Sequence, residues 1–285
     1  MGTIIRVKSA DFSNSPLGRV TSEDAIAAQI VSNYVEAIGD STYQDELIAM
    51  VKSLLQNDLL DGLDIYPILG NNLSKKLVNL NPDRGTIKVD LKTGNQASSV
   101  DNYINFDQST PVGSISGVKY KSDVVMNDFY IAADMQRVAT SPNTSPLYSP
   151  FSGFLCNLGG RNVPSVGAGA TVFEITGNYI AVNNTTRKLI SGSIFTNSGA
   201  SVGSIDLYAD AVKVNEIDLS YAVTTIENYN PGIIGSIGGK HDSSDTTEIF
   251  DGKCWFFAYG FVEHSKRKLI DTIFKTFLDA VKPRS

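Results

Sequence analysis

The chain has 285 residues, of which 42% are hydrophobic and 19% are charged. This length and composition are sufficient for a full core, so we expect one large domain with an accessory segment. The formal net charge of -6 argues against a nucleic-acid-binding surface, because contacts to phosphates need clustered lysine and arginine. The one basic cluster, Lys266–Lys268, opens an expected helix, and we interpret it as the solvated first turn of that helix.

The start of the chain and its two cysteines indicate where the protein is made. Residues 1–8 lack the apolar stretch of a signal peptide, and no stretch approaches the ~18 apolar residues of a membrane span. Cys156 and Cys254 each lie in an apolar, strand-like run, which favours buried thiols over a disulfide framework or a metal site. We therefore expect a soluble protein that is made in a cytoplasm and has no membrane partner.

The N-terminal segment, residues 1–20, is predicted to be an arm. Residues 3–8 alternate like a short strand, and a single strand of this length is not stable alone. Two interpretations stay open: the strand pairs with the domain's own sheet, or the arm docks on a neighbouring subunit or a larger assembly. The candidate docking residues of the arm are Ile4, Ile5, Val7 and Phe12.

Two amphipathic helices are predicted after the arm. The first is capped by residues 21–24 and ends at Gly39, while the second starts from a capping box of Ser41 and Gln44 and ends at residues 61–62. So short a joint predicts an antiparallel helical hairpin, whose apolar stripes need a partner surface. That surface is either the main domain or the same hairpin of another subunit. The candidate assembly residues of the stripes are Ile26, Ile30, Tyr34, Leu47 and Leu54.

The connector places a Tyr-Pro-x-x-Gly motif, a short polar spacer and an Asn-Leu pair directly after these helices. This order resembles a recurring N-terminal module of bacteriophage structural proteins, in which it precedes a concanavalin A-like domain. Residues 10–13 also resemble the opening of such chains. The resemblance implies that the arm and residues 21–82, the hairpin and connector, attach or oligomerise the protein. The matching residues of the connector are Tyr66, Pro67, Gly70, Asn79 and Leu80.

From residue 86 to residue 264 the helical period is absent, and short strand-like runs alternate with turn residues. This spacing is typical of a sandwich or jelly roll rather than of βαβ units. We therefore predict a mainly β (α+β) chain, with an antiparallel β-sandwich over residues 83–285. The candidate strands are residues 86–91, 103–106, 124–135, 153–158, 171–175, 179–182, 188–195, 204–208, 212–217, 232–235 and 253–261.

Residues 204–215 alternate like two short strands around a turn at residues 210–211, where Asp-Ala stands in place of the usual Asn-Gly. A glycine-rich return at residues 230–239 and an apolar strand at residues 250–261 follow. This order resembles the C-terminal half of the concanavalin A/LamG-like β-sandwich. Residues 124–135 resemble another strand of that fold, with alanine where tryptophan is usual.

An amphipathic helix with Ser265 as its N-cap is predicted to close the chain. Its apolar face would be buried against the sandwich or against the helical hairpin, which would stabilise the fold by several kcal/mol at ~1.5–3 kcal/mol per large side chain. The residues of that face are Leu269, Ile273, Phe274, Phe277, Leu278 and Val281.

Several glycoside hydrolases share this fold, so an enzyme has to be considered. Retaining members carry Glu-x-Asp-x-x-Glu or Glu-x-Asp-x-Glu on one strand, because two carboxylates about 5 Å apart act as nucleophile and acid/base. The nearest run has Glu216 and Asp218, but Ser220 and Tyr221 occupy the position of the second glutamate. We therefore predict no catalytic site and interpret this run as a solvent-facing strand end.

Two candidate binding sites remain. His241, Asp242 and Asp245 in a polar loop are candidate ligands for Ca²⁺, since related folds bind cations at a sheet rim. Tyr148 and Phe151 are candidate sugar-stacking residues in a proline-rich stretch. In the alternative interpretation these two rings pin a long loop to the sandwich edge. No other cofactor is expected.

The resemblance and the strand pattern together imply a non-enzymatic virion structural protein of a bacteriophage, a fibre or other appendage component of head or tail. We expect a homo-oligomer that contacts other virion proteins and is made in the host cytoplasm. In this hypothesis the sandwich is the outward module for host attachment. The alternative function is a carbohydrate-binding, lectin-like module that recognises a host surface glycan. A concanavalin A-like glycoside hydrolase is the third hypothesis.

Overall fold

The computed structural model describes the two helices, the strands of three sheets and the closing helix. The arm residues Ile4, Ile5, Val7 and Phe12 lie outside the described residues, so their predicted docking role stays a prediction. The described residues are 22–82, 88–90, 98–100, 103–106, 114–116, 128–137, 144–151, 154–160, 165, 170–175, 178–196, 202–220, 236–237 and 252–282.

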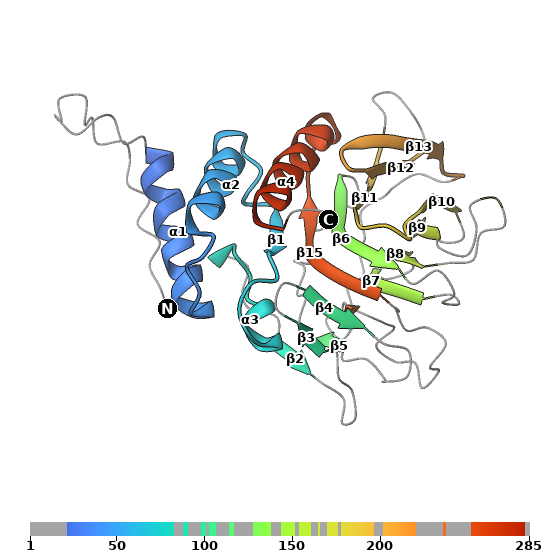
Figure 1. Ribbon diagram of the computed structural model, residues 1–285. Coiled ribbons are helices and arrows are strands. Elements are labelled where there is room, and N and C mark those ends of the chain that lie inside the picture. The colour runs from blue at the N-terminus through green and yellow to red at the C-terminus, as the bar shows by residue number, and fades with distance from the viewer. Residues whose placement is uncertain are drawn as a thin grey trace.

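Two antiparallel sheets form the body of the protein (Figure 1). In the eight-stranded sheet, seven strands follow one path and β1 pairs with β15 beside that path. The strands of this large sheet are β13 (Val212–Asp218), β12 (Ser204–Ala209), β11 (Lys188–Phe195), β6 (Phe129–Arg137), β15 (Gly252–Phe261), β4 (Tyr103–Phe106), β3 (Ser98–Val100) and β1 (Leu63–Tyr66). The five-stranded sheet consists of β10 (Asn178–Asn183), β9 (Ala170–Ile175), β8 (Phe154–Gly160), β7 (Thr144–Phe151) and β14 (Ser236–Ile237). A separate pair joins β2 (Lys88–Asp90) to β5 (Ser114–Ser116).

The two sheets pack face to face, which confirms the predicted β-sandwich. Gly192 of β11 lies directly over the ring of Phe173 in β9, and an added Cβ there would come within 2.3 Å of that ring. A side chain at this position would therefore force the sheets apart. The buried residues of this inner core come from both sheets: Ile104, Phe129, Ile131, Ala133, Met135, Leu158, Phe173, Ile180, Ile190, Ile194, Ile205, Leu207, Cys254, Phe257 and Tyr259, together with Tyr66, Ile68, Leu77 and Leu219.

Three helices cover the other face of the large sheet, so the molecule has a helical layer and two sheet layers (Figure 1). They are α1 (Ser22–Ile38), α2 (Gln44–Gln56) and α4 (Arg267–Val281). Alternation along β6 and β15 explains this second core, because Tyr130, Ala132, Phe256 and Ala258 face the helices while their neighbours face the small sheet. No helix within the described part of the chain combines the length and the apolar character that crossing a membrane requires.

The predicted helical hairpin is present, and it uses its apolar stripes within the chain. Tyr34, Leu47 and Leu54 are buried in the core shared with α4 and the large sheet. Ile30 is partly buried against the same core, whereas Ile26 is 47% exposed. Of the two partner surfaces considered, the hairpin packs on the sandwich of its own chain in the described residues. An assembly role for these side chains stays a prediction.

Two of the three predicted N-terminal helix caps, those of α2 and α4, were wrong. The N-cap position of α2 is Tyr43, and Ser41 contributes only its backbone carbonyl, which accepts from the Gln44 amide. The turn there is organised instead by Asp40, whose carboxylate accepts from the amide and hydroxyl of Thr42. At α4 a short 3-10 turn, His264–Lys266, precedes the α-helix, so Ser265 lies before the N-cap position and its hydroxyl donates to the Glu263 carboxylate.

The connector is built into the large sheet rather than standing beside it. Strand β1 pairs with β15, and Tyr66 is fully buried in the inner core. The Asn79 side-chain oxygen accepts from the Ile65 amide at 3.0 Å, and the Leu80 amide donates to the Ile65 carbonyl at 2.8 Å. Gly70 has a φ of +98°, which a side chain would adopt only with strain. The segment with the phage-like motif therefore completes the sandwich, together with the short helix α3 (Leu73–Lys76).

The predicted hairpin at residues 210–211 is confirmed. Asp210 and Ala211 have φ values of +52° and +65°, the left-handed conformations that a two-residue turn of this kind needs. Asp210 also anchors the turn to the neighbouring strand, because its carboxylate accepts from the Leu189 amide at 3.0 Å and its own amide donates to the Leu189 carbonyl at 2.8 Å.

Candidate functional site: an aromatic row on the large sheet

The side chains that sequence analysis proposed for binding lie outside the part of the structure that is described. His241, Asp242 and Asp245 lie outside the described residues, so the proposed Ca²⁺ site stays a prediction. Tyr148 and Phe151 lie on β7 of the small sheet, and their side chains are outside the described part of the structure. Among the residues that the structure does describe, no group of three or more His, Cys, Asp and Glu side chains is placed to hold a metal ion.

The acidic run on β13 forms local pairs. Glu216 pairs with Lys213 on the exposed hairpin, and this hydrogen bond raises the pKa of the lysine. The Asp218 carboxylate accepts from the Ser204 hydroxyl at 2.7 Å across the strand pair. Both carboxylates therefore have partners in the fold, which matches the interpretation of this run as a strand end.

A bulge in β15 shapes a surface around Trp255 that sequence analysis did not identify. Cys254 is opposite Met135 and Phe256 is opposite Asp134, so Trp255 is an extra residue without a partner in the ladder between β15 and β6. A bulge of this kind re-aims a side chain. Cys254 faces the inner core and Phe256 packs under α4, whereas Trp255 is partly exposed.

Trp255 belongs to a row of four side chains in which two adjacent aromatic rings are flanked by one cation at each end. Its ring lies 5.3 Å from that of Tyr103, centroid to centroid, with the planes tilted by 46°. The Lys253 ammonium lies 5.0 Å from the Tyr103 ring, and the Arg187 guanidinium lies 4.7 Å from the Trp255 ring. All four side chains are partly exposed. We call Lys253, Tyr103, Trp255 and Arg187 the aromatic row.

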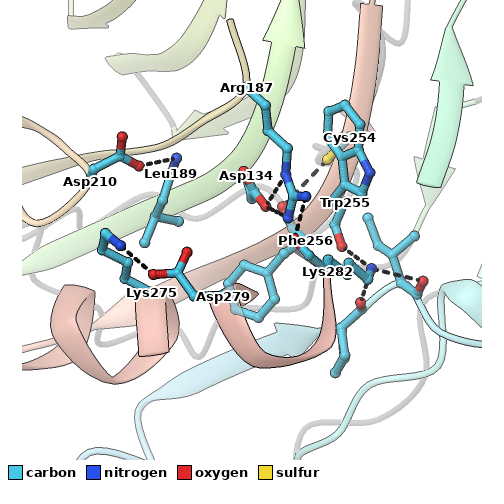
Figure 2. Close-up of polar contacts among 12 residues, drawn as sticks. Asp134, Arg187, Leu189, Asp210, Cys254, Trp255, Phe256, Lys275, Asp279 and Lys282 are labelled. Atoms are coloured by element: carbon cyan, nitrogen blue, oxygen red, sulfur yellow. Dashed lines mark hydrogen bonds and ion pairs between the residues drawn. The ribbon is translucent and has the colours of Figure 1, made fainter. Parts of the chain in front are cut away.

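Arg187 holds one end of the aromatic row in place. Its Nε donates to the fully buried Asp134 carboxylate at 2.8 Å, and Nη2 forms an ion pair with the same oxygen. Its Nη1 donates to the Lys282 carbonyl at 2.5 Å, just past the end of α4 (Figure 2). With its donors engaged in this way, the guanidinium supports the indole ring rather than offering itself to a ligand.

Two buried lysines lie beneath the aromatic row. The Lys282 ammonium donates to the carbonyls of Pro67, Ile68 and Trp255 at 2.8, 3.2 and 2.5 Å (Figure 2). The Lys76 ammonium donates to the Tyr103 carbonyl at 3.2 Å. The backbone of each aromatic residue is thus fixed by a lysine from another element. Burial lowers the pKa of Lys282 to about 7, although the Asp134 carboxylate acts in the opposite direction.

A second polar cluster lies at the other end of α4. Arg267 is buried between the rings of Tyr130 and Tyr208, at 4.7 and 4.5 Å from their centroids. It pairs with Asp271 at 2.6 Å and lies 3.5 Å from the Asp206 carboxylate. Burial raises the pKa of Tyr130 well above its ordinary value. Since Arg267, Asp206 and Asp271 are at most 1% exposed, this cluster anchors the helix and presents no surface to a substrate.

Comparison with known proteins gives similarity in fold only. No protein-family model and no curated protein matches the chain. The CBM40 of Ruminococcus gnavus IT-sialidase, bound to alpha2,6 sialyllactose, is 10% identical over 52% of this chain and 84% of its own, with a TM-score of 0.35. An endo-1,3-beta-glucanase from Streptomyces sioyaensis is 11% identical over 70% of this chain and 90% of its own, with a TM-score of 0.34.

Botulinum neurotoxin type C, whose cell entry depends upon interaction with two ganglioside molecules, is 12% identical. That similarity covers 78% of this chain and 52% of the neurotoxin chain, with a TM-score of 0.47. The chain itself is an antiparallel β-sandwich with a helical layer, and its large sheet carries a partly exposed aromatic row.

Proposed function

We propose that the protein is a non-enzymatic carbohydrate-binding module and that the aromatic row is its sugar-contacting surface. The observation that carries this proposal is the placement of Trp255 and Tyr103 side by side, partly exposed, on adjacent strands of the large sheet. One of these rings is displaced outward by a β-bulge, a feature that is found next to functional sites.

The chemistry of this surface suits a sugar ring. One face of a pyranose carries C–H groups that pack on an aromatic plane, while its hydroxyls need hydrogen-bond partners around that plane. Asn105 and Gln136 both lie opposite Lys253 in the register of the sheet, on the face that carries Tyr103. Two amides and one ammonium therefore lie on the same face as the aromatic pair, and the Gln136 amide nitrogen donates to the Thr185 carbonyl at 3.0 Å. This is the mixture of apolar area and few polar groups that ligand sites typically have.

The proposal is tested by titrating the full chain against a glycan array and measuring the affinity of the best ligand by calorimetry. We expect Trp255→Ala and Tyr103→Ala each to weaken binding by about 2 kcal/mol, or roughly 30-fold in Kd, as truncation of an interface aromatic does. Tyr179→Ala is the matched control, because Tyr179 is 39% exposed on β10 of the small sheet. Binding that survives both row variants unchanged would place the sugar site elsewhere, with Tyr148 and Phe151 as the next candidates.

A virion structural role is the second candidate, and it is compatible with the first. What supports it is the resemblance of residues 63–82 to a phage module. In this chain, Tyr66 of that motif lies on β1, which pairs with β15, and Asn79 accepts a hydrogen bond from the Ile65 amide of the same strand. Gold labelling of purified virions with an antibody against this chain tests it. Labelled particles at head or tail would support an appendage protein, and unlabelled particles would contradict it.

A further inference from the structure

Lys282 joins three segments of the chain that are distant in sequence. It follows directly after α4, and its ammonium donates to carbonyls of the connector and of the bulge in β15. Its own carbonyl accepts from Arg187, which lies on the indole ring. Lys282 therefore acts on Trp255 in two ways. Its ammonium binds the Trp255 carbonyl directly, and its carbonyl holds the Arg187 guanidinium that lies on the indole ring.

We propose that Lys282 is a positioning residue for the aromatic row: the protonated side chain holds the bulge that presents Trp255, and loss of the proton releases it. The consequence for ligand binding rests on the proposed function, whereas the movement of Trp255 does not.

The number of donors explains why the proton matters. A lysine ammonium has three N–H donors, and here three carbonyl oxygens accept them. The neutral amine has two N–H donors and one lone pair, which repels a carbonyl oxygen. Deprotonation therefore breaks at least one of the three contacts. The connector carbonyls belong to the backbone that leads from β1 to α3, while the Trp255 carbonyl lies in the bulge, where that residue has no ladder partner across to β6.

The groups around Lys282 place this proton loss near neutral pH. Burial is the largest influence and lowers the pKa from 10.5 to about 7. The carboxylate of Asp134 on β6 raises it, and the cations of Lys76 on α3 and Arg187 before β11 lower it further. The Cys254 thiol on β15 is a further titratable neighbour, but burial raises its own pKa to about 12, so it stays neutral in this range.

Trp255 is the single tryptophan of the chain, so its fluorescence reports on this site directly. We expect the tryptophan emission of the full-length protein to shift in one transition centred near pH 7, with higher quenching by acrylamide on the alkaline side. Lys282→Met should abolish the transition. Lys275→Met is the matched control, because Lys275 lies on α4 and pairs with Asp279 at the surface. That variant should keep the transition unchanged.

Three results would overturn the proposal. They are a wild-type protein without a transition near neutral pH, a transition that persists in Lys282→Met, and a transition that is lost in Lys275→Met. The first measurement needs no variant to fold. A further variant, Asp134→Asn, should move the midpoint to lower pH, because it removes the charge that favours the ammonium. An unchanged or raised midpoint would contradict the assignment to Lys282.

Sugar binding is then measured separately across the same pH range. We expect affinity to fall several-fold above the transition in the wild type, and to be weak and independent of pH in Lys282→Met. A Lys282-dependent transition in a protein that binds no sugar would leave the positioning role intact and refute the proposed function. Sugar binding that is constant through the transition would instead refute the link between them.

Discussion

The Tyr66 ring stacks on the Phe257 ring, with 4.2 Å between centroids and 13° between the planes. This contact joins β1, which follows the helical hairpin, to β15, which precedes the closing helix. The two residues are also direct partners in the register of the sheet. The stacking therefore reinforces backbone pairing at the point where the N-terminal quarter of the chain enters the sandwich.

Tyr66→Ala should accordingly destabilise the whole fold. A fully buried aromatic side chain lost from a core costs about 3–5 kcal/mol, because the cavity does not close completely. Chemical denaturation monitored by circular dichroism measures the difference in free energy of unfolding. Tyr179→Ala serves as the control, since an exposed tyrosine on β10 should change stability by no more than about 0.5 kcal/mol. Equal effects of the two substitutions would contradict the role given to the connector.

Ala211→Gly should stabilise the protein. Ala211 has a φ of +65°, in a region that costs an L-residue with a Cβ about 1–2 kcal/mol. Glycine removes that strain but adds entropy to the unfolded chain, so the expected net gain is about 0.5–1 kcal/mol. Ala28→Gly is the opposite case, because Ala28 is exposed in the interior of α1 and the substitution should cost about 1 kcal/mol there. Thermal unfolding of both variants checks the two signs together, and a loss of stability in Ala211→Gly would be inconsistent with the strained turn.

The pH dependence of stability follows from Lys282. Its pKa is about 7 in the folded protein and 10.5 when unperturbed, so between these values the unfolded chain binds more protons than the folded one. The free energy of unfolding contributed by this group therefore increases as pH rises from about 7 to 10.5 and is constant below 7. Subtracting the unfolding free energy of Lys282→Met from that of the wild type at each pH isolates this contribution. A difference that declines over this range would show that the folded pKa is not lowered.

The arm can be separated from the helical layer by truncation. Deleting residues 1–20 leaves α1 and the second core complete, and we expect a folded protein that no longer forms the predicted homo-oligomer. Deleting residues 1–62 removes two of the three helices that cover the large sheet, so we expect unfolding or aggregation. Light scattering coupled to size-exclusion chromatography measures both outcomes. An unchanged oligomeric state after the shorter deletion would exclude an assembly role for the arm.

Much of the architecture could be predicted from periodicity. The apolar stripes of α1, α2 and α4 follow the helical period, and the strand pattern with its frequent turns indicated a sandwich. The caps were wrong because Ser41 and Ser265 satisfy a local sequence rule, while Asp40 and a 3-10 turn decide the local geometry. Helix ends depend on a few competing hydrogen bonds, and sequence spacing does not rank them.

The aromatic row could not be predicted in the same way. Strict alternation along residues 253–261 would place Trp255 on the inner-core face, with Phe257 and Tyr259. The bulge instead brings its ring beside that of Tyr103. Lys76 and Lys282 were also missed, because lysine is almost never fully buried unless it is paired. A single tryptophan in a strand otherwise rich in core residues was the one available signal.

The pairing of β1 with β15 also constrains when the protein can fold during its synthesis. Pro67 and Lys282 are separated by 215 positions, and the large sheet gains its interior strand β15 only after residue 261 has left the ribosome. Until then β6 lacks one of its two partners, and the apolar faces of α1 and α2 lack the part of the large sheet that β15 forms. These sheet and helix contacts can therefore form only after residue 282 has been synthesised, and contacts of such long sequence separation form slowly. Apolar surface that stays exposed until then is the kind that leads to aggregation and that chaperones shield.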